Sequence, residues 1–300
     1  GGYGTRFNEL ANWLRNDEFT RMWRAADTPR MLVLHLDGAG PFGDPYHVNS
    51  ANNGPQGDAL VRELIPFVEK TYRGLGAGQA RVLDGASTGG WVALALQIFY
   101  PDLFNGAWSH CPDPADFRAY ELINIYQDDS AYVNRFGFDR PSTRTLAGDV
   151  VTTVRHECHL ERVLGRAGRW ELSGKDWCSW NAVFGPRGAD GLPVPLWHGL
   201  SGKIDRKVVD HWKNYDLRLI LETNWPALAP RLRGKLRIWV GEADEYFLNN
   251  AVHLLDDFLT RAQPPYEGKI TYGPGKGHAW RGLTERQMLA DMGKVLKSAR

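Results

Sequence analysis

The chain has 300 residues, with 36 Lys and Arg against 35 Asp and Glu, and its formal net charge is +1 at pH 7. This length suits one large domain or a core with a sizeable insertion, and 43% hydrophobic residues is an ordinary share for a globular protein. The balanced charge disfavours nucleic acid and anionic membranes as partners, and no apolar run is long enough to span a bilayer.

Cysteine usage leaves the cellular compartment open. Cys111, Cys158 and Cys178 are too few and too scattered for a disulfide framework, although one bridge can form among them. No signal peptide begins at Gly1, and the chain does not begin with Met. We expect a secreted or periplasmic location if a leader was removed, and the sequence leaves the oligomeric state open.

The first quarter of the chain predicts two helices around a strand. Residues 5–25 carry apolar side chains at helical spacing, and residues 31–36 are an apolar run of strand length. The next segment, through Gly57, is rich in Gly, Pro, Asn and Asp and reads as a loop. Helical spacing resumes over residues 59–72.

Strands and helices alternate over much of the remaining chain, and this order favours a mostly parallel sheet flanked by helices. The predicted strands are residues 82–83, 105–109, 236–240 and 269–272, and the predicted helices are residues 91–100, 250–261 and 284–297.

Residues 112–230 break this alternation and are expected to form an insertion or cap over a core made of residues 1–111 and 231–300. The interval holds many turns and aromatic residues, and it has helical spacing at 151–164 and 206–221. Three of its tryptophans, Trp177, Trp180 and Trp197, are candidates for lining a substrate pocket, and packing within the insertion is the alternative for them.

Ser87 is the candidate nucleophile. It is the centre of the pentapeptide Gly85-Ala-Ser-Thr-Gly89, which follows a short predicted strand and precedes a predicted helix. This order is typical of a nucleophile elbow, in which a tight turn requires small neighbours around the serine. The backbone N–H of Thr88 opens the helix and is the candidate first donor to an oxyanion.

Asp244 and His278 complete the candidate triad. A serine hydroxyl needs a neutral imidazole to take its proton, and the imidazole needs a carboxylate to hold its tautomer. The residues follow the chain order serine, acid, histidine, and both partners come directly after predicted strands. Glu242 and Glu245 are rival acids, with Glu242 the second choice.

These motifs resemble the esterase branch of the α/β-hydrolase superfamily, which includes esterase D-type enzymes, feruloyl esterases and mycolyltransferases. The resemblance is carried by Val33-Leu-His-Leu-Asp-Gly38, Glu63-Leu-Ile-Pro66, Tyr72-Arg73, Gly85–Gly90, Tyr100-Pro-Asp-Leu-Phe104 and Gly277-His278. It covers residues 31–110 well and about the last 70 residues loosely. It implies the α/β-hydrolase fold and a Ser-Asp-His triad acting on esters or thioesters without a metal or organic cofactor.

The resemblance also makes the backbone N–H of Tyr3 the candidate second oxyanion donor. In such enzymes a Gly-rich loop supplies this donor, and an amphipathic helix follows it, as residues 1–4 and 5–25 do here. The strand before that loop is then absent from the sequence. Either the chain was cut from a longer protein, or another segment fills the gap, or Gly1-Gly2 is a remnant and residues 35–40 form the oxyanion strand and loop.

Two further groups of residues invite a metal interpretation. His156 and His159 share a face of a predicted helix, but no further ligand pair at zinc spacing accompanies them, so we expect a structural or surface role. Asp113, Asp116 and Asp190 lack the alternation of a calcium loop and are interpreted as turn and cap residues.

The sequence thus predicts a serine carboxylesterase acting on a small-molecule or polysaccharide-linked ester through an acyl-enzyme. One alternative is an acyltransferase that uses the same triad with a sugar or alcohol acceptor. Another is a non-catalytic scaffold whose Trp-rich insertion binds a glycan or a protein.

Overall fold

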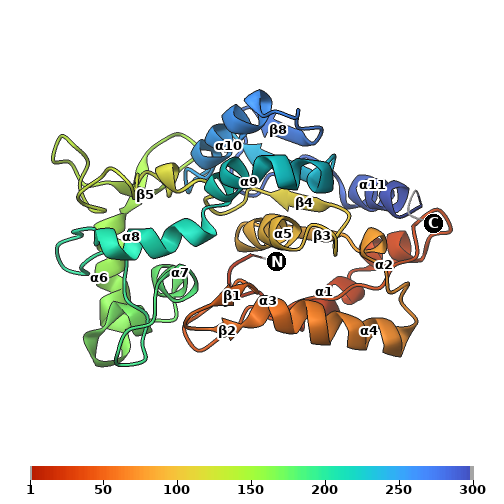
Figure 1. Ribbon diagram of the computed structural model, residues 1–300, viewed down its shortest axis with the longest axis horizontal. Coiled ribbons are helices and arrows are strands. Elements are labelled where there is room, and N and C mark those ends of the chain that lie inside the picture. Colours follow the sequence, from red (N-terminus) through yellow and green to blue (C-terminus); the bar gives the residue numbers. More distant parts are fainter. Residues whose placement is uncertain (1, 298–300) are drawn as a thin grey trace.

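The structure is a computed structural model that describes residues 2–297. A four-stranded parallel sheet with the order β3-β4-β7-β8 forms its centre (Figure 1). The four strands are Leu83–Ala86 (β3), Ala107–His110 (β4), Leu236–Gly241 (β7) and Lys269–Gly273 (β8). Because all four strands are parallel, the loops that follow them meet at one edge of the sheet.

One face of the sheet is covered by α5 (Thr88–Phe99), α9 (Leu217–Leu232) and α10 (Asn249–Arg261). α5 follows β3 directly and is buried over most of its length, as its apolar sequence predicts. It lies close to β4, where Ser109 Oγ donates a hydrogen bond to the Gly90 carbonyl at 2.9 Å.

The opposite face is covered by α11 (Glu285–Lys297) together with α2 (Asp17–Arg24). Trp108 of β4 and Trp239 of β7 are buried there against Leu289 and Met292. The single helix expected over residues 5–25 is divided into α1 (Glu9–Arg15) and α2. The division is at Asn16, whose side chain caps α2 by accepting the Phe19 N–H at 3.0 Å.

The strand expected at residues 31–36 is a wrong prediction. These residues have no regular structure, and Leu32, Val33 and Leu34 are 52%, 46% and 40% exposed. An apolar run becomes a strand only where another strand accepts its backbone hydrogen bonds, and none does so in the described part of the chain. The helix expected at 59–72 is present as α3 (Gln56–Ala59), a π-helical turn (Leu60–Leu64) and α4 (Ile65–Tyr72).

Residues 112–230 lie between two adjacent strands, β4 and β7, and hold their own small sheet of β5 (Pro141–Arg144) and β6 (Val150–Thr153). Besides most of α9, the α-helices of this interval are α6 (Val154–Leu164), α7 (Asp176–Phe184) and α8 (Arg206–Trp212). Figure 1 shows this part to one side of the sheet, whereas α9 packs on α5. A second hairpin is formed by β1 (Asn49–Ser50) and β2 (Gly54–Pro55).

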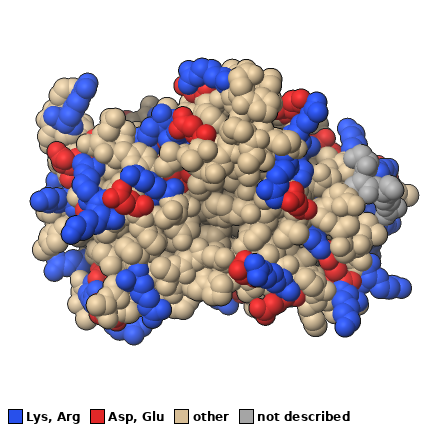
Figure 2. All heavy atoms as spheres, viewed as in Figure 1, with Lys and Arg blue, Asp and Glu red and all other residues tan. Residues whose placement is uncertain are grey.

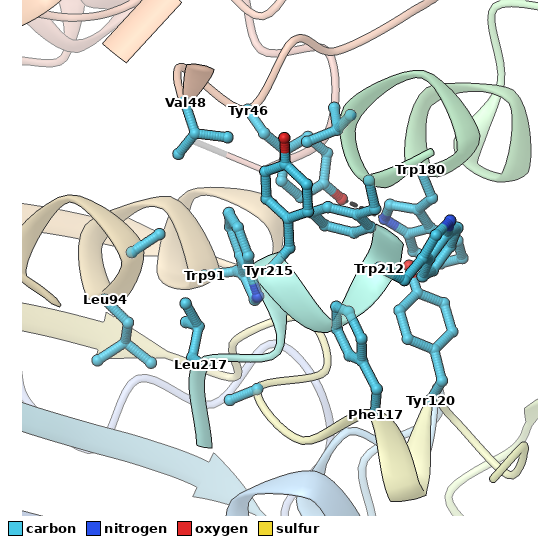
Figure 3. Packing of buried hydrophobic residues seen from close by; sticks show 14 of the residues in the cluster. Tyr46, Val48, Trp91, Leu94, Phe117, Tyr120, Trp180, Trp212, Tyr215 and Leu217 are labelled. Atoms are coloured by element: carbon cyan, nitrogen blue, oxygen red, sulfur yellow. Dashed lines mark hydrogen bonds between the residues drawn. The ribbon is translucent and has the colours of Figure 1, made fainter. Parts of the chain in front are cut away.

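An aromatic cluster joins the insertion to the sheet layer (Figure 3). Trp91 of α5 packs on Phe184 of α7 with ring centroids 5.1 Å apart, and Tyr46 packs on both rings. Large buried rings contribute much of the burial free energy of a core, so this cluster holds α7 against α5.

The three cysteines, Cys111, Cys158 and Cys178, are all buried, and none of them forms a disulfide. Among the described residues no helix combines the length and the apolar character needed to cross a lipid bilayer. On the face shown in Figure 2, acidic and basic side chains are interspersed around the edge, so no patch of one sign dominates it.

Candidate active site

Ser87 lies in a strained turn between β3 and α5. Its backbone has φ 56° and ψ −125°, a conformation that non-glycine residues rarely adopt. The turn is so tight that a Cβ at Gly85 would collide with the Gly89 carbonyl. The Ser87 N–H donates to the His110 carbonyl at the end of β4, 2.9 Å away. Ser87 is therefore presented at the carboxyl edge of the sheet, as its pentapeptide predicts.

The Ser87 hydroxyl donates to a buried carboxyl group, Asp113 Oδ1, at 3.3 Å. Asp113 follows β4, and its N–H donates to the Ser87 carbonyl at 3.2 Å. Asp113 lies in a bend after β4, in keeping with its interpretation as a turn residue, but it is only 6% exposed and its carboxylate is turned toward Ser87, which that interpretation did not include. Asp116 and Asp190 do bind nearby backbone N–H groups and arginines, as expected.

Asp113 belongs to a buried chain of hydrogen bonds that reaches the insertion. The hydroxyls of Tyr46 and Thr88 donate to Asp113 Oδ2 at 2.5 and 3.1 Å. The indole N–H of Trp180 in turn donates to the Tyr46 hydroxyl, a contact drawn in Figure 3. Burial raises the pKa of Asp113, against the lowering effect of the hydrogen bond from Tyr46.

His278 and Asp244 form a hydrogen-bonded pair at the same edge. His278 follows β8 and Asp244 follows β7, and His278 Nδ1 lies 2.9 Å from Asp244 Oδ2. Asp244 is fully buried, and its Oδ1 accepts the N–H of Tyr246 at 2.9 Å. Burial by itself lowers the pKa of His278, but the hydrogen bond and charge of Asp244 outweigh it, and the pKa is raised above its ordinary value.

The rival acids have other partners. Glu242 Oε2 lies 3.1 Å from His253 Nε2, on α10. Glu245 Oε2 accepts the backbone N–H of His278 at 2.6 Å and so holds the loop, while the imidazole faces Asp244. The geometry therefore pairs Asp244, rather than Glu242, with the histidine ring.

Cys111 lies beside the histidine–aspartate pair. It directly follows His110, whose carbonyl accepts the Ser87 N–H, and its Sγ donates to the Trp280 carbonyl at 3.3 Å. A ligand atom of each of Cys111, Asp244 and His278 lies within 4.8 Å of the other two. No hydrogen bond joins Ser87 to His278 within residues 2–297, because the hydroxyl is turned to Asp113.

The two candidate oxyanion donors also lie by Ser87. Thr88 is the first residue of α5, and a Cβ placed on Gly2 would be 4.0 Å from the Ser87 Cβ, so the loop holding Tyr3 passes beside the serine. Asp44 Oδ2 accepts the Gly4 N–H at 3.0 Å and anchors this loop. Residues 35–40, the alternative oxyanion loop, are instead tied through Gly38 to Thr5.

The three candidate pocket tryptophans are buried. Trp177, Trp180 and Trp197 are 2%, 7% and 1% exposed, and Trp177 packs on the other two rings at 4.6 and 5.0 Å. Their contacts are those of core packing, and only Trp180 is linked to Ser87, through Tyr46 and Asp113. His156 and His159 take part in no cluster of metal-binding side chains among the described residues.

The sequence of residues 10–218 matches the protein family described as "Putative esterase". This match covers well over half of the chain. The chain belongs to this family. It is accordingly a carboxylic ester hydrolase with the α/β-hydrolase fold.

The chain is similar to solved structures at low sequence identity. A ferulic acid esterase aligns with 98% of this chain and 83% of its own, at 14% identity and a TM-score of 0.52. An S-formylglutathione hydrolase from Agrobacterium tumefaciens (13% identity, 99% and 80% covered) and MPT51 from Mycobacterium tuberculosis (16%, 85% and 73%) both give TM-scores of 0.43. No match was found among curated proteins.

The part of the candidate site that the sequence did not reveal is the buried group around Asp113. Asp113-Pro114 reads locally as a turn, and Tyr46 lies in a segment that reads as a loop. Their association joins positions 67 residues apart. The only available signal was the position of Asp113 just beyond a predicted strand at the edge that also holds Ser87.

Proposed function

We propose that this esterase hydrolyses a small-molecule or polysaccharide-linked ester through an acyl-enzyme formed on Ser87. The observation that carries the proposal is the hydrogen bond between His278 Nδ1 and the buried Asp244, at the same sheet edge where Ser87 has its strained conformation. A base held by a carboxylate beside a serine is the arrangement that nucleophilic acyl transfer needs.

In the proposed reaction the Ser87 hydroxyl turns from Asp113 toward His278 and attacks the ester carbonyl. His278 Nε2 takes the hydroxyl proton and then gives it to the leaving alcohol, while Asp244 stabilises the imidazolium. Water then attacks the acyl-enzyme with His278 again as base. Hydrogen bonds of this kind commonly shorten when substrate binds, so the resting contact with Asp113 is compatible with the mechanism.

The oxyanion formed in each step is assigned to the backbone N–H groups of Thr88 and Tyr3. Neither N–H donates to another group within the described chain; Thr88 directly follows Ser87, and a Cβ on Gly2, the residue before Tyr3, would lie 4.0 Å from the Ser87 Cβ. The partial positive charge at the start of α5 adds to the stabilisation of an anion there. Thr88 contributes through its backbone, while its side chain donates to Asp113.

Hydrolysis of a p-nitrophenyl ester by Ser87→Ala tests the proposal. We expect kcat/KM to fall about 10⁴-fold or more, because the nucleophile is lost. Ser201→Ala, at an exposed serine of the insertion, is the matched control and keeps wild-type activity. Thermal unfolding of both variants verifies that the fold is intact. Unchanged hydrolysis in Ser87→Ala contradicts the proposal.

A further inference from the structure

The β5–β6 hairpin of the insertion is fastened to the loop that holds Asp244. The Arg144 N–H donates to the Glu245 carbonyl and its Nε donates to the Asp244 carbonyl, each at 3.0 Å. The guanidinium of Arg144 also lies over the Phe247 ring, 4.5 Å from its centre. A hydrogen-bonded cation over an aromatic ring is a directional contact, so the hairpin has a defined position beside the site.

The tip of this hairpin carries an exposed leucine next to the His278 loop. The tip is closed by the Thr145 N–H donating to the Asp149 carbonyl at 2.8 Å. A Cβ placed on Gly277 would lie 2.6 Å from Leu146 Cδ2, so Leu146 sits directly on the backbone preceding His278. Leu146 nevertheless keeps 59% of its surface exposed.

A second exposed apolar group adjoins the imidazole itself. The Tyr246 ring meets the His278 ring edge to face, with centroids 4.8 Å apart, and Tyr246 is 42% exposed. Its backbone N–H is held by Asp244, so the ring position does not depend on the side chain alone. Leu146 thus contacts the backbone just before His278, and Tyr246 contacts the ring of His278, the residue that is proposed to protonate the leaving group.

We propose that Leu146 and Tyr246 form the subsite for the alcohol part of the ester, and that this subsite selects an apolar alcohol. The inference rests on the proposed function, in which His278 gives its proton to the leaving oxygen. That oxygen must lie within hydrogen-bonding distance of His278, so the carbon atoms attached to it lie over the exposed faces of these two side chains. Apolar atoms of the alcohol lose water there, which favours binding.

Charged groups of both signs lie around the subsite. The Glu245 carboxylate lies at Gly277 and binds the His278 N–H, and Asp244 and Asp113 both act on the His278 imidazole. Arg144 is directed to the Asp244 carbonyl and the Phe247 ring. The carboxylates repel an anionic alcohol, whereas the exposed Lys276 and Arg281 of the His278 loop attract one, so the selection rests on the apolar contacts with Leu146 and Tyr246.

Two acetate esters of similar length test the subsite: hexyl acetate and 2-(2-methoxyethoxy)ethyl acetate. Both release a primary alcohol, so the ratio of their kcat/KM values reports the alcohol subsite. We expect wild type to prefer hexyl acetate, and Leu146→Ser and Tyr246→Ser each to reduce the ratio about five-fold or more. Leu160→Ser, at an exposed leucine of α6, is the control and keeps the ratio.

A second ratio, p-nitrophenyl hexanoate against p-nitrophenyl acetate, reports the acyl side and should be unchanged in Leu146→Ser. The proposed subsite is contradicted if wild type shows no preference for hexyl acetate. It is also contradicted if Leu146→Ser and Tyr246→Ser both still hydrolyse the esters with an alcohol ratio within two-fold of the wild-type ratio. If wild type and Ser87→Ala hydrolyse all the esters equally, the proposed function itself fails and the subsite falls with it.

Discussion

At the scale of single residues, Ser87 has two possible partners, a base and a buried acid. His278 is held by Asp244 and has a raised pKa, whereas Asp113 holds the serine hydroxyl in the resting structure. Asp113 also contributes to the raised pKa of His278 through its charge. A carboxyl group that acts on both the nucleophile and the base is expected to set the pH dependence of the reaction.

The Asp113→Asn variant tests this role. The folded pKa of His278 is raised, so the neutral base is lost, and with it activity, as pH falls through a value above the ordinary 6.5. Removing the negative charge lowers that pKa, and we expect the acid limb of the kcat/KM profile to move to lower pH by up to about one unit.

Asp216→Asn, at another buried aspartate, is the matched control for the loss of a buried carboxylate. Its acid limb should coincide with that of wild type. An unmoved acid limb in Asp113→Asn would mean that Asp113 carries no charge in the pH range of activity.

At the scale of secondary-structure elements, the insertion is joined to the site by helix contacts. Glu161 of α6 is buried, and its carboxylate accepts the N–H groups of Trp177 and Cys178 at the start of α7, at 2.9 and 3.0 Å. This capping sets the position of α7, whose Trp180 reaches Tyr46. Burial raises the pKa of Glu161 to about 7.

Glu161 therefore makes stability depend on pH. Because its folded pKa lies above its ordinary 4.5, its favourable contribution is complete below pH 4.5 and is lost as pH rises through about 7. Glu161→Gln does not titrate, so its free energy of unfolding should fall less than that of wild type between pH 5 and pH 8, by about 2.5 kcal/mol.

Urea unfolding of wild type and Glu161→Gln at both pH values measures this difference. The comparison between pH values removes the constant effect of exchanging a carboxylate for an amide at the start of α7. Equal pH dependence in the two proteins would show that Glu161 titrates normally in the folded state.

At the scale of the whole molecule, local sequence patterns predicted the helices and strands that make up the layers of the fold. Contacts between distant segments determined the features that these patterns did not predict. The apolar periods placed β7, α10 and α11 within one or two residues of their observed ends, because each pattern lies within its own element. The apolar run at 31–36 is not a strand, since strand formation depends on a neighbour that a local pattern cannot reveal.

The candidate site likewise contains some residues that local sequence patterns reveal and others that only the folded structure brings together. Ser87, Asp244 and His278 were predicted to act together because their order and their positions after strands are visible along the chain. Asp113, Tyr46 and Leu146 were not, because each reaches the site through contacts between distant segments. A buried carboxyl and an exposed hairpin tip look alike in sequence until the insertion is folded against the sheet.

The central claim is that Ser87 is a nucleophile activated by the pair of His278 and Asp244. Fluorophosphonate labelling followed by peptide mass spectrometry tests it most directly, because the probe reacts with an activated serine and needs no knowledge of the substrate. We expect one adduct, on Ser87, which is absent in Ser87→Ala and forms far more slowly in His278→Ala. No adduct on Ser87, or equal labelling rates with and without His278, would contradict it and favour a non-catalytic scaffold.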